Sequence, residues 1–67
     1  MNITINNNER EFNDGISLTE VIASIENMPT QGYAVAVNNE VVKADERDAY
    51  TLKEGDKVMI IRAFYGG

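Results

Sequence analysis

The sequence contains no cysteine, histidine or tryptophan. Without cysteine the chain can form no disulfide, bind no iron–sulfur cluster through thiolates and use no cysteine nucleophile. Without histidine it lacks the usual general base and the commonest metal ligand. These absences argue against an enzyme that acts alone. We therefore expect no catalytic residue, no metal site and no bound cofactor.

Positive charge is also scarce, because six Lys and Arg residues stand against 11 Asp and Glu, a net charge of −5. Nucleic acids and anionic membranes both select cationic surfaces, so neither is an expected partner. No apolar run approaches the ~18 residues of a transmembrane helix. The first six residues have no basic region and alternate like a strand, which is not typical of a signal peptide. A cytoplasmic location is the expectation.

Sixty-seven residues, 43% hydrophobic and 25% charged, suit one small folded domain spanning residues 1–67. No linker, internal repeat or low-complexity tract divides the chain. A domain of this size buries only about 60% of its unfolded surface, so its core is marginal. The sequence therefore has no room for a second module.

The N-terminal segment has the pattern of a hairpin. Met1, Ile3 and Ile5 alternate with polar residues, as in a strand with one buried face. Three asparagines at 6–8 favour a turn, and residues 9–12 then form a return strand.

One helix is predicted over residues 17–27. Ser17 and Glu20 form a capping-box pattern at its start, and Pro29 prevents its continuation. Its apolar stripe occupies positions i, i+3, i+4 and i+7: Leu18, Val21, Ile22 and Ile25.

The second half of the chain has the pattern of further strands. We expect a hairpin first, with a strand at 33–37, an Asn-Asn turn at 38–39 and a return strand at 40–42. A charged connection at 43–48 and a short extended piece at 50–52 follow. A turn at 53–56 then leads into a last strand at 57–63. One amphipathic helix must cover one face of the sheet, which gives an α+β fold with four to five strands in a mixed sheet. If the first strand pairs in parallel with the last, the fold is a β-grasp, or ubiquitin-like, roll. Composition alone leaves other one-helix arrangements open.

The last strand should present apolar side chains on both faces. By alternation, Val58 and Ile60 face the helix, while Met59 and Ile61 face outward. An exposed apolar patch there would suit docking to a partner, unless another segment covers it. Phe64 and Tyr65 follow and either anchor the tail in a partner's cleft or fold back on the sheet.

The sequence finishes with Gly66 and Gly67. Two residues without Cβ atoms can thread a narrow channel and leave the last acyl carbon unhindered. Four extended residues span roughly 13–14 Å, enough to enter another protein's active site. A frayed terminus is the alternative interpretation.

The sequence resembles the ThiS family of ubiquitin-like sulfur carriers over its whole length. The similarity includes residues 17–20 at the helix start, 34–38 in the third strand, 40–42 in the fourth, Gly55-Asp56 before the last strand and the terminal Gly66-Gly67. The Gly-Asp turn and the Gly-Gly tail are the most specific of these, and other ubiquitin-like sulfur carriers share both. The sequence departs from the family at Lys43, where relatives often have Pro-Arg, and at Phe64-Tyr65, where many have small or aliphatic residues.

This resemblance implies a protein cosubstrate, monomeric when free, that carries sulfur for thiamine biosynthesis. An E1-like adenylating enzyme would consume ATP to activate the Gly67 carboxylate. Sulfur from a donor such as a cysteine desulfurase would then produce a thiocarboxylate, which thiazole synthase would use. Gly66, Phe64, Tyr65, Met59 and Ile61 are the other expected site and docking residues.

Three other functions remain open at this point. The chain also suits a sulfur carrier of another pathway, such as the small subunit of molybdopterin synthase or a tRNA-thiolation carrier. A ubiquitin-like modifier that forms isopeptide bonds is a second possibility. A plain interaction module is a third.

Overall fold

The computed structural model describes residues 1–26, 28 and 32–62, and within them it has five strands, one α-helix and a short 3₁₀ helix. In chain order these are β1 (Asn2–Ile5), β2 (Asn8–Glu11), α1 (Leu18–Ala23), β3 (Tyr33–Val37), β4 (Glu40–Val42), η1 (Ala44–Glu46) and β5 (Lys57–Arg62). The predicted order of elements is confirmed. Within the described residues, no helix is long and apolar enough to cross a membrane.

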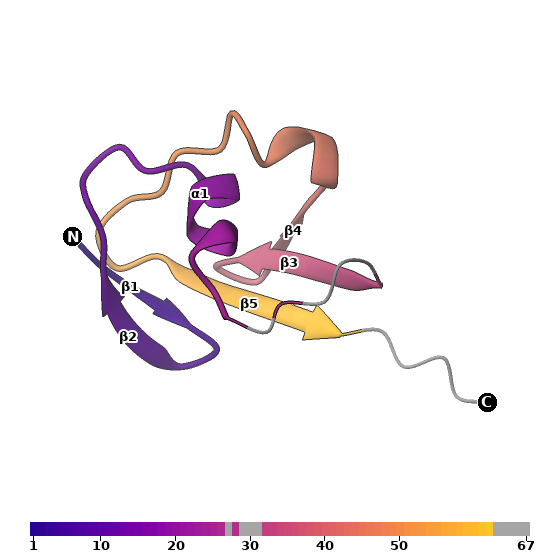
Figure 1. Cartoon of the computed structure of the whole chain (residues 1–67), viewed down its shortest axis with the longest axis horizontal. Helices are drawn as coiled ribbons and strands as arrows, with labels where there is room; N and C mark the ends of the chain where they lie inside the picture. The colour runs from indigo at the N-terminus through magenta and orange to yellow at the C-terminus, as the bar shows by residue number, and fades with distance from the viewer. Residues whose placement is uncertain (27, 29–31, 63–67) are drawn as a thin grey trace.

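The strands form one mixed sheet in the order β2-β1-β5-β3-β4 (Figure 1). The last strand lies at the centre, parallel to β1 and antiparallel to β3. The two hairpins, β1–β2 and β3–β4, flank it. This arrangement is the β-grasp roll, and the parallel pairing of β1 with β5 is the feature that selects it.

Both hairpins turn on a pair of asparagines. Asn6 and Asn7 have φ values of 49° and 70°, and Asn38 and Asn39 have values of 51° and 71°. Positive φ at both central residues is the requirement of a type I′ turn, whose twist matches that of the flanking strands. Asparagine tolerates this conformation better than most residues, so the turns form where the sequence predicted them.

Helix α1 begins as predicted and ends earlier. The Ser17 hydroxyl accepts a hydrogen bond from the Glu20 N–H at 3.2 Å, and the Glu20 carboxylate accepts one from the Ser17 N–H at 3.2 Å. The helix ends at Ala23, because the Ser24 N–H and hydroxyl both donate to the Val21 carbonyl, at 3.1 and 2.6 Å. These bonds use the i−3 carbonyl and close the helix. The predicted end at Asn27 is therefore wrong, and Asn27 itself lies outside the described residues.

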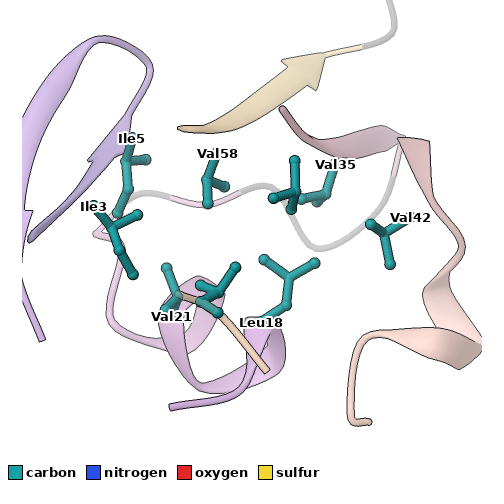
Figure 2. Close-up of a cluster of buried hydrophobic side chains, with 9 residues drawn as sticks. Ile3, Ile5, Leu18, Val21, Val35, Val42 and Val58 are labelled. Carbon is teal, nitrogen blue, oxygen red and sulfur yellow. The ribbon is translucent and has the colours of Figure 1, made fainter. Parts of the chain in front are cut away.

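The core lies between α1 and one face of the sheet (Figure 2). Leu18 and Val21 are fully buried against residues from every strand except β2; the buried cluster is Ile3, Ile5, Leu18, Val21, Val35, Val37, Val42, Leu52 and Val58. Ile22 and Ile25, predicted as core residues, are half-buried and pack on the edge of this cluster. They extend the apolar contact without being enclosed, Ile22 from within the helix and Ile25 from the segment after its end at Ala23.

The segment at 50–52 pairs with the start of the helix and not with the main sheet. Thr51 forms an isolated antiparallel bridge with Ser17. The Leu18 N–H donates to the Tyr50 carbonyl at 2.8 Å, and the Leu52 N–H donates to the Ile16 carbonyl at 3.0 Å. These bonds hold Leu52 in the core, where its side chain is 2% exposed.

Candidate functional site

The expected reactive end and its two aromatic neighbours lie outside the described residues. Gly66, Gly67, Phe64 and Tyr65 all fall in the range 63–67. The last described residue, Arg62, is also the last residue of β5. The structure therefore bears on this site through the strand that leads into it.

The start of β5 is fixed by a buried carboxylate. Asp56 is 5% exposed, and its two oxygens accept hydrogen bonds from the Asn38 side-chain amide at 3.0 Å and from the Lys53 N–H at 2.8 Å. The Asn38 side-chain oxygen accepts from the Lys57 N–H at 3.0 Å. The Asn38 N–H also donates to the Lys57 carbonyl at 2.8 Å. The β3–β4 turn is thereby bonded directly to the first residue of β5.

The middle of β5 is fixed by the other hairpin. The Asn6 N–H donates to the Val58 carbonyl at 2.9 Å, and the Asn6 side-chain oxygen accepts from the Ile60 N–H at 2.8 Å. The side chain thus extends the parallel ladder past the end of β1. The sequence predicted the asparagines as turn formers only. Their second role, as supports for the strand before residues 63–67, depends on a distant pairing that no local pattern signals.

The outer face of the sheet, away from α1, carries a continuous apolar patch. Met59 and Ile61 are 42% and 46% exposed, which confirms their predicted outward orientation. Val41 is 66% exposed and pairs with Ala36, which is only 5% exposed and in turn pairs with Met59. Directly paired residues share a face, with Cβ atoms about 4.5–5.5 Å apart, so these side chains form one row. We call Val41, Ala36, Met59 and Ile61 the outer patch.

Val41 was not singled out by the sequence analysis. Its orientation follows once a two-residue turn at Asn38-Asn39 sets the register, because Val42 then faces the core and Val41 the opposite side. Residues of the same face in β1 and β2 are polar, with Thr4 paired to Lys57 and Glu9 paired to Thr4. The outer patch therefore covers the β5-β3-β4 half of the sheet.

The acidic segment after β4 does not form a metal site. Asp48 accepts a hydrogen bond from the Thr19 hydroxyl at 2.5 Å, which bonds this segment to the helix. Across residues 1–26, 28 and 32–62, no group of three or more acidic, His or Cys side chains could hold a metal ion. Asp45 and Glu46 belong to η1 and are exposed.

The phenol of Tyr50 has a perturbed pKa. Burial raises it above its ordinary value near 10, and the negative charges of Asp56 and Glu40 raise it further. Tyr50 therefore stays protonated at neutral pH. The described residues thus present an apolar outer face on the sheet and a strand, β5, that side-chain hydrogen bonds hold at its start and middle.

Comparisons with known proteins give one consistent result. The model of the ThiS family matches residues 3–67. The crystal structure of a thiamine biosynthesis protein (ThiS) from Geobacter metallireducens is similar at 28% identity and a TM-score of 0.86, with all of both chains covered. A solution structure of a thiamine biosynthesis protein from the same organism is similar at 29% identity and a TM-score of 0.71, covering all of this chain and 87% of the other. Among curated proteins, no sequence matches.

Proposed function

The chain belongs to the ThiS family, and from this premise we propose that it is the sulfur carrier of thiamine biosynthesis and that Gly67 is the residue that carries the sulfur. The observation that carries the proposal is the extent of the family match, which runs to residue 67 and so includes Gly66 and Gly67. The chain is a cosubstrate in this role, and its chemistry is performed by partner enzymes.

The chemistry starts from a poor electrophile. A free carboxylate resists nucleophilic attack, so the Gly67 carboxylate first attacks the α-phosphorus of ATP on an E1-like adenylating enzyme and releases pyrophosphate. The resulting acyl-adenylate has a good leaving group. A donor such as a cysteine desulfurase supplies the sulfur as a persulfide, whose outer sulfur attacks the acyl carbon, and AMP departs with the former carboxylate oxygen. A thiol reductant then cleaves the S–S bond of this acyl disulfide and leaves in a disulfide with the donor's sulfur. The product is a C-terminal thiocarboxylate, which thiazole synthase then uses as its sulfur source.

The fold suits the proposed role because the strand before the tail is rigidly held. Asn38 and Asp56 fix the start of β5, and Asn6 fixes its middle. A partner that binds the folded domain would thereby also fix the position of the end of β5, which precedes residues 63–67. Precise alignment of the reacting carbon contributes strongly to such acyl transfers.

The outer patch is the surface we assign to the adenylating enzyme and to thiazole synthase. It lies on the strand that leads to Gly66-Gly67, and Met59 and Ile61 on that strand are both exposed. An apolar surface of this kind favours protein contacts. We propose that the free protein is a monomer in the cytoplasm, where the partner enzymes use ATP, and that Phe64 and Tyr65 add anchoring contacts.

Mass spectrometry tests the proposal directly. Incubated with its cognate adenylating enzyme, ATP, magnesium and sodium sulfide, the intact chain should gain roughly 16 Da, since one terminal oxygen is replaced by sulfur. Deletion of Gly67 should abolish the gain without unfolding the domain, because the core lies within the described residues.

Extension by one residue is the matched control for that deletion. It keeps both glycines but moves the terminal acyl carbon by about 3.3–3.6 Å, so the gain should again be lost. A band shifted by attachment to a lysine, and stable to reducing agent, would instead identify a ubiquitin-like modifier. Absence of both adenylate exchange and a mass gain with the native chain would overturn the assignment.

A further inference from the structure

A second surface feature lies beside the outer patch, where β4 meets η1 and the segment after it. It is a groove of about 460 Å³. Its apolar lining comes from Val41, Val42, Ala49 and Tyr50, and its carboxylates are Glu40, Asp45 and Glu46. Nothing in the proposed sulfur chemistry uses this groove.

The carboxylates of the groove form no ion pair with any side chain in the part of the chain that the structure describes. Glu40, Asp45 and Glu46 are exposed, and none of the hydrogen bonds and ion pairs between described residues involves their side chains. The nearest arginine in sequence, Arg47, is engaged elsewhere, since its guanidinium lies 5.0 Å from the centre of the Tyr33 ring and donates to the Tyr33 hydroxyl at 3.3 Å. The one lysine beside these carboxylates in sequence is Lys43, the N-cap of η1, so the groove has three carboxylates against one ammonium group and keeps an excess of negative charge for an external cation.

The lining selects the type of cation. Val41 and Ala49 offer apolar contacts to an alkyl stem, and the Tyr50 ring offers a π face. Burial and nearby negative charge raise the pKa of the Tyr50 phenol, so it adds no anion of its own near neutral pH. A compact metal ion would gain nothing from such walls. An arginine side chain matches them best, because its guanidinium can pair with carboxylates and stack on an aromatic ring at once.

The groove is continuous with the outer patch. Val41 belongs to both, being 66% exposed, lining the groove and paired with Ala36 in the row that reaches Met59. A protein that covers the outer patch therefore also reaches the mouth of the groove. The net charge of this chain is −5, which further favours a partner with a basic contact surface.

We propose that this groove receives an arginine side chain of the adenylating enzyme when that enzyme docks on the outer patch. This inference rests on the proposed function and adds to it a second contact, which is electrostatic, at the β4 edge of the sheet. The outer patch supplies apolar burial, and the groove fixes how the domain is rotated on its partner.

Isothermal titration calorimetry with the cognate adenylating enzyme tests the inference. The double variant Asp45→Asn/Glu46→Gln should bind about tenfold more weakly than the native chain, because two carboxylates that face the guanidinium are lost. The loss should shrink as salt is raised, since screening weakens the native contact as well. Circular dichroism should show an unchanged fold, because both side chains are exposed and unbonded.

The matched control is Asp14→Asn/Glu26→Gln, which also removes one Asp and one Glu charge but at exposed positions outside the groove. The Asp14 carboxylate lies 3.7 Å from the N-terminal ammonium of Met1, so the free energy of unfolding of this control is measured as well. Its affinity should stay within about threefold of the native value, since only long-range attraction changes. Equal losses in the two double variants, or no loss in either, would overturn the groove contact while the mass gain of the native chain upheld the carrier role. A native chain that neither binds the enzyme nor gains mass would overturn both proposals.

Discussion

The two faces of β5 differ although their residues alternate along one strand. On the inner face Val58 is 1% exposed and Ile60 is half-buried against the core. On the outer face Met59 and Ile61 are 42% and 46% exposed. All four side chains are apolar, so hydrophobicity alone does not separate them. Their position relative to α1 does.

This difference separates stability from recognition within one strand. Val58 lies in the buried cluster with Leu18 and Val21 of the helix (Figure 2), Ile60 packs against that cluster, and the burial of these inner residues stabilises the domain. Outer residues keep much of their surface in water, so their burial would stabilise a complex instead. Substitution at an inner position should therefore change folding, and substitution at an outer position should change docking.

The same substitution at adjacent residues gives the sharpest test of this division. Val58→Asp places a charge in a closed apolar core and should cost more than about 4–5 kcal/mol, which exceeds or consumes the stability of a small domain. The variant should show no cooperative unfolding transition in a denaturant titration followed by circular dichroism.

Met59→Asp is its matched control. The charge there enters water, so the free energy of unfolding should fall by less than about 1 kcal/mol. Its affinity for the adenylating enzyme should drop by more than about tenfold, because a charge is costly to bury in an apolar contact. Unchanged affinity by calorimetry would remove the outer patch from the docking surface.

A smaller effect distinguishes the enclosed from the marginal positions of the helix. Leu18→Ala should lower the free energy of unfolding by about 2–5 kcal/mol, since it leaves a cavity in a filled core. Ile22→Ala should cost only about 1–2 kcal/mol, because part of its side chain is already in water. Urea titrations of both variants measure the difference. Equal losses would mean that Ile22 is as much a core residue as Leu18.

The smallest expected effect is confined to alkaline pH. The pKa of Tyr50 is raised in the folded protein, so above about pH 10 the unfolded chain loses this proton before the folded protein does. The free energy of unfolding should therefore not depend on this group below about pH 10. It should decline as the pH rises from the pKa of Tyr50 in the unfolded chain to its higher pKa in the folded protein. In Tyr50→Phe the decline should be shallower. Thermal midpoints of the two proteins between about pH 9 and about pH 11 provide the measurement, and parallel curves would contradict the prediction.

The sequence predicted the local features of the fold well. The capping box at Ser17, the two asparagine turns and the alternation around Met59 are all set by neighbours within a few residues. The predicted end of the helix lies too far along the chain. The apolar spacing continues to Ile25, but the Ser24 hydroxyl and N–H both bond to the Val21 carbonyl and end the helix at Ala23. Local competition of this kind leaves no trace in hydrophobic spacing.

The distant features were less accessible. Parallel pairing of Thr4 with Lys57 could be stated only as a condition of the β-grasp fold. The bonds of the buried Asp56 to Asn38 depend on the antiparallel pairing of β3 with β5, and the groove beside Val41 depends on how the segment after β4 folds back on that strand. The sequence predicted the part of the candidate docking surface that lies on β5, namely Met59 and Ile61. It missed Val41 on β4, because no orientation was assigned to that strand.

The central place of β5 has a consequence for the order in which the domain forms. Each hairpin closes over two residues, so both can form as soon as their own segments exist. The hairpins have no shared neighbour until β5 enters between β1 and β3 (Figure 1). That step joins Thr4 to Lys57 and has a large loop-closure entropy cost, so we expect it to be the slow step of folding. During synthesis the sheet cannot be completed before its central strand has been made, so we expect a nascent chain to become a folded domain only once residues 57–62 are available.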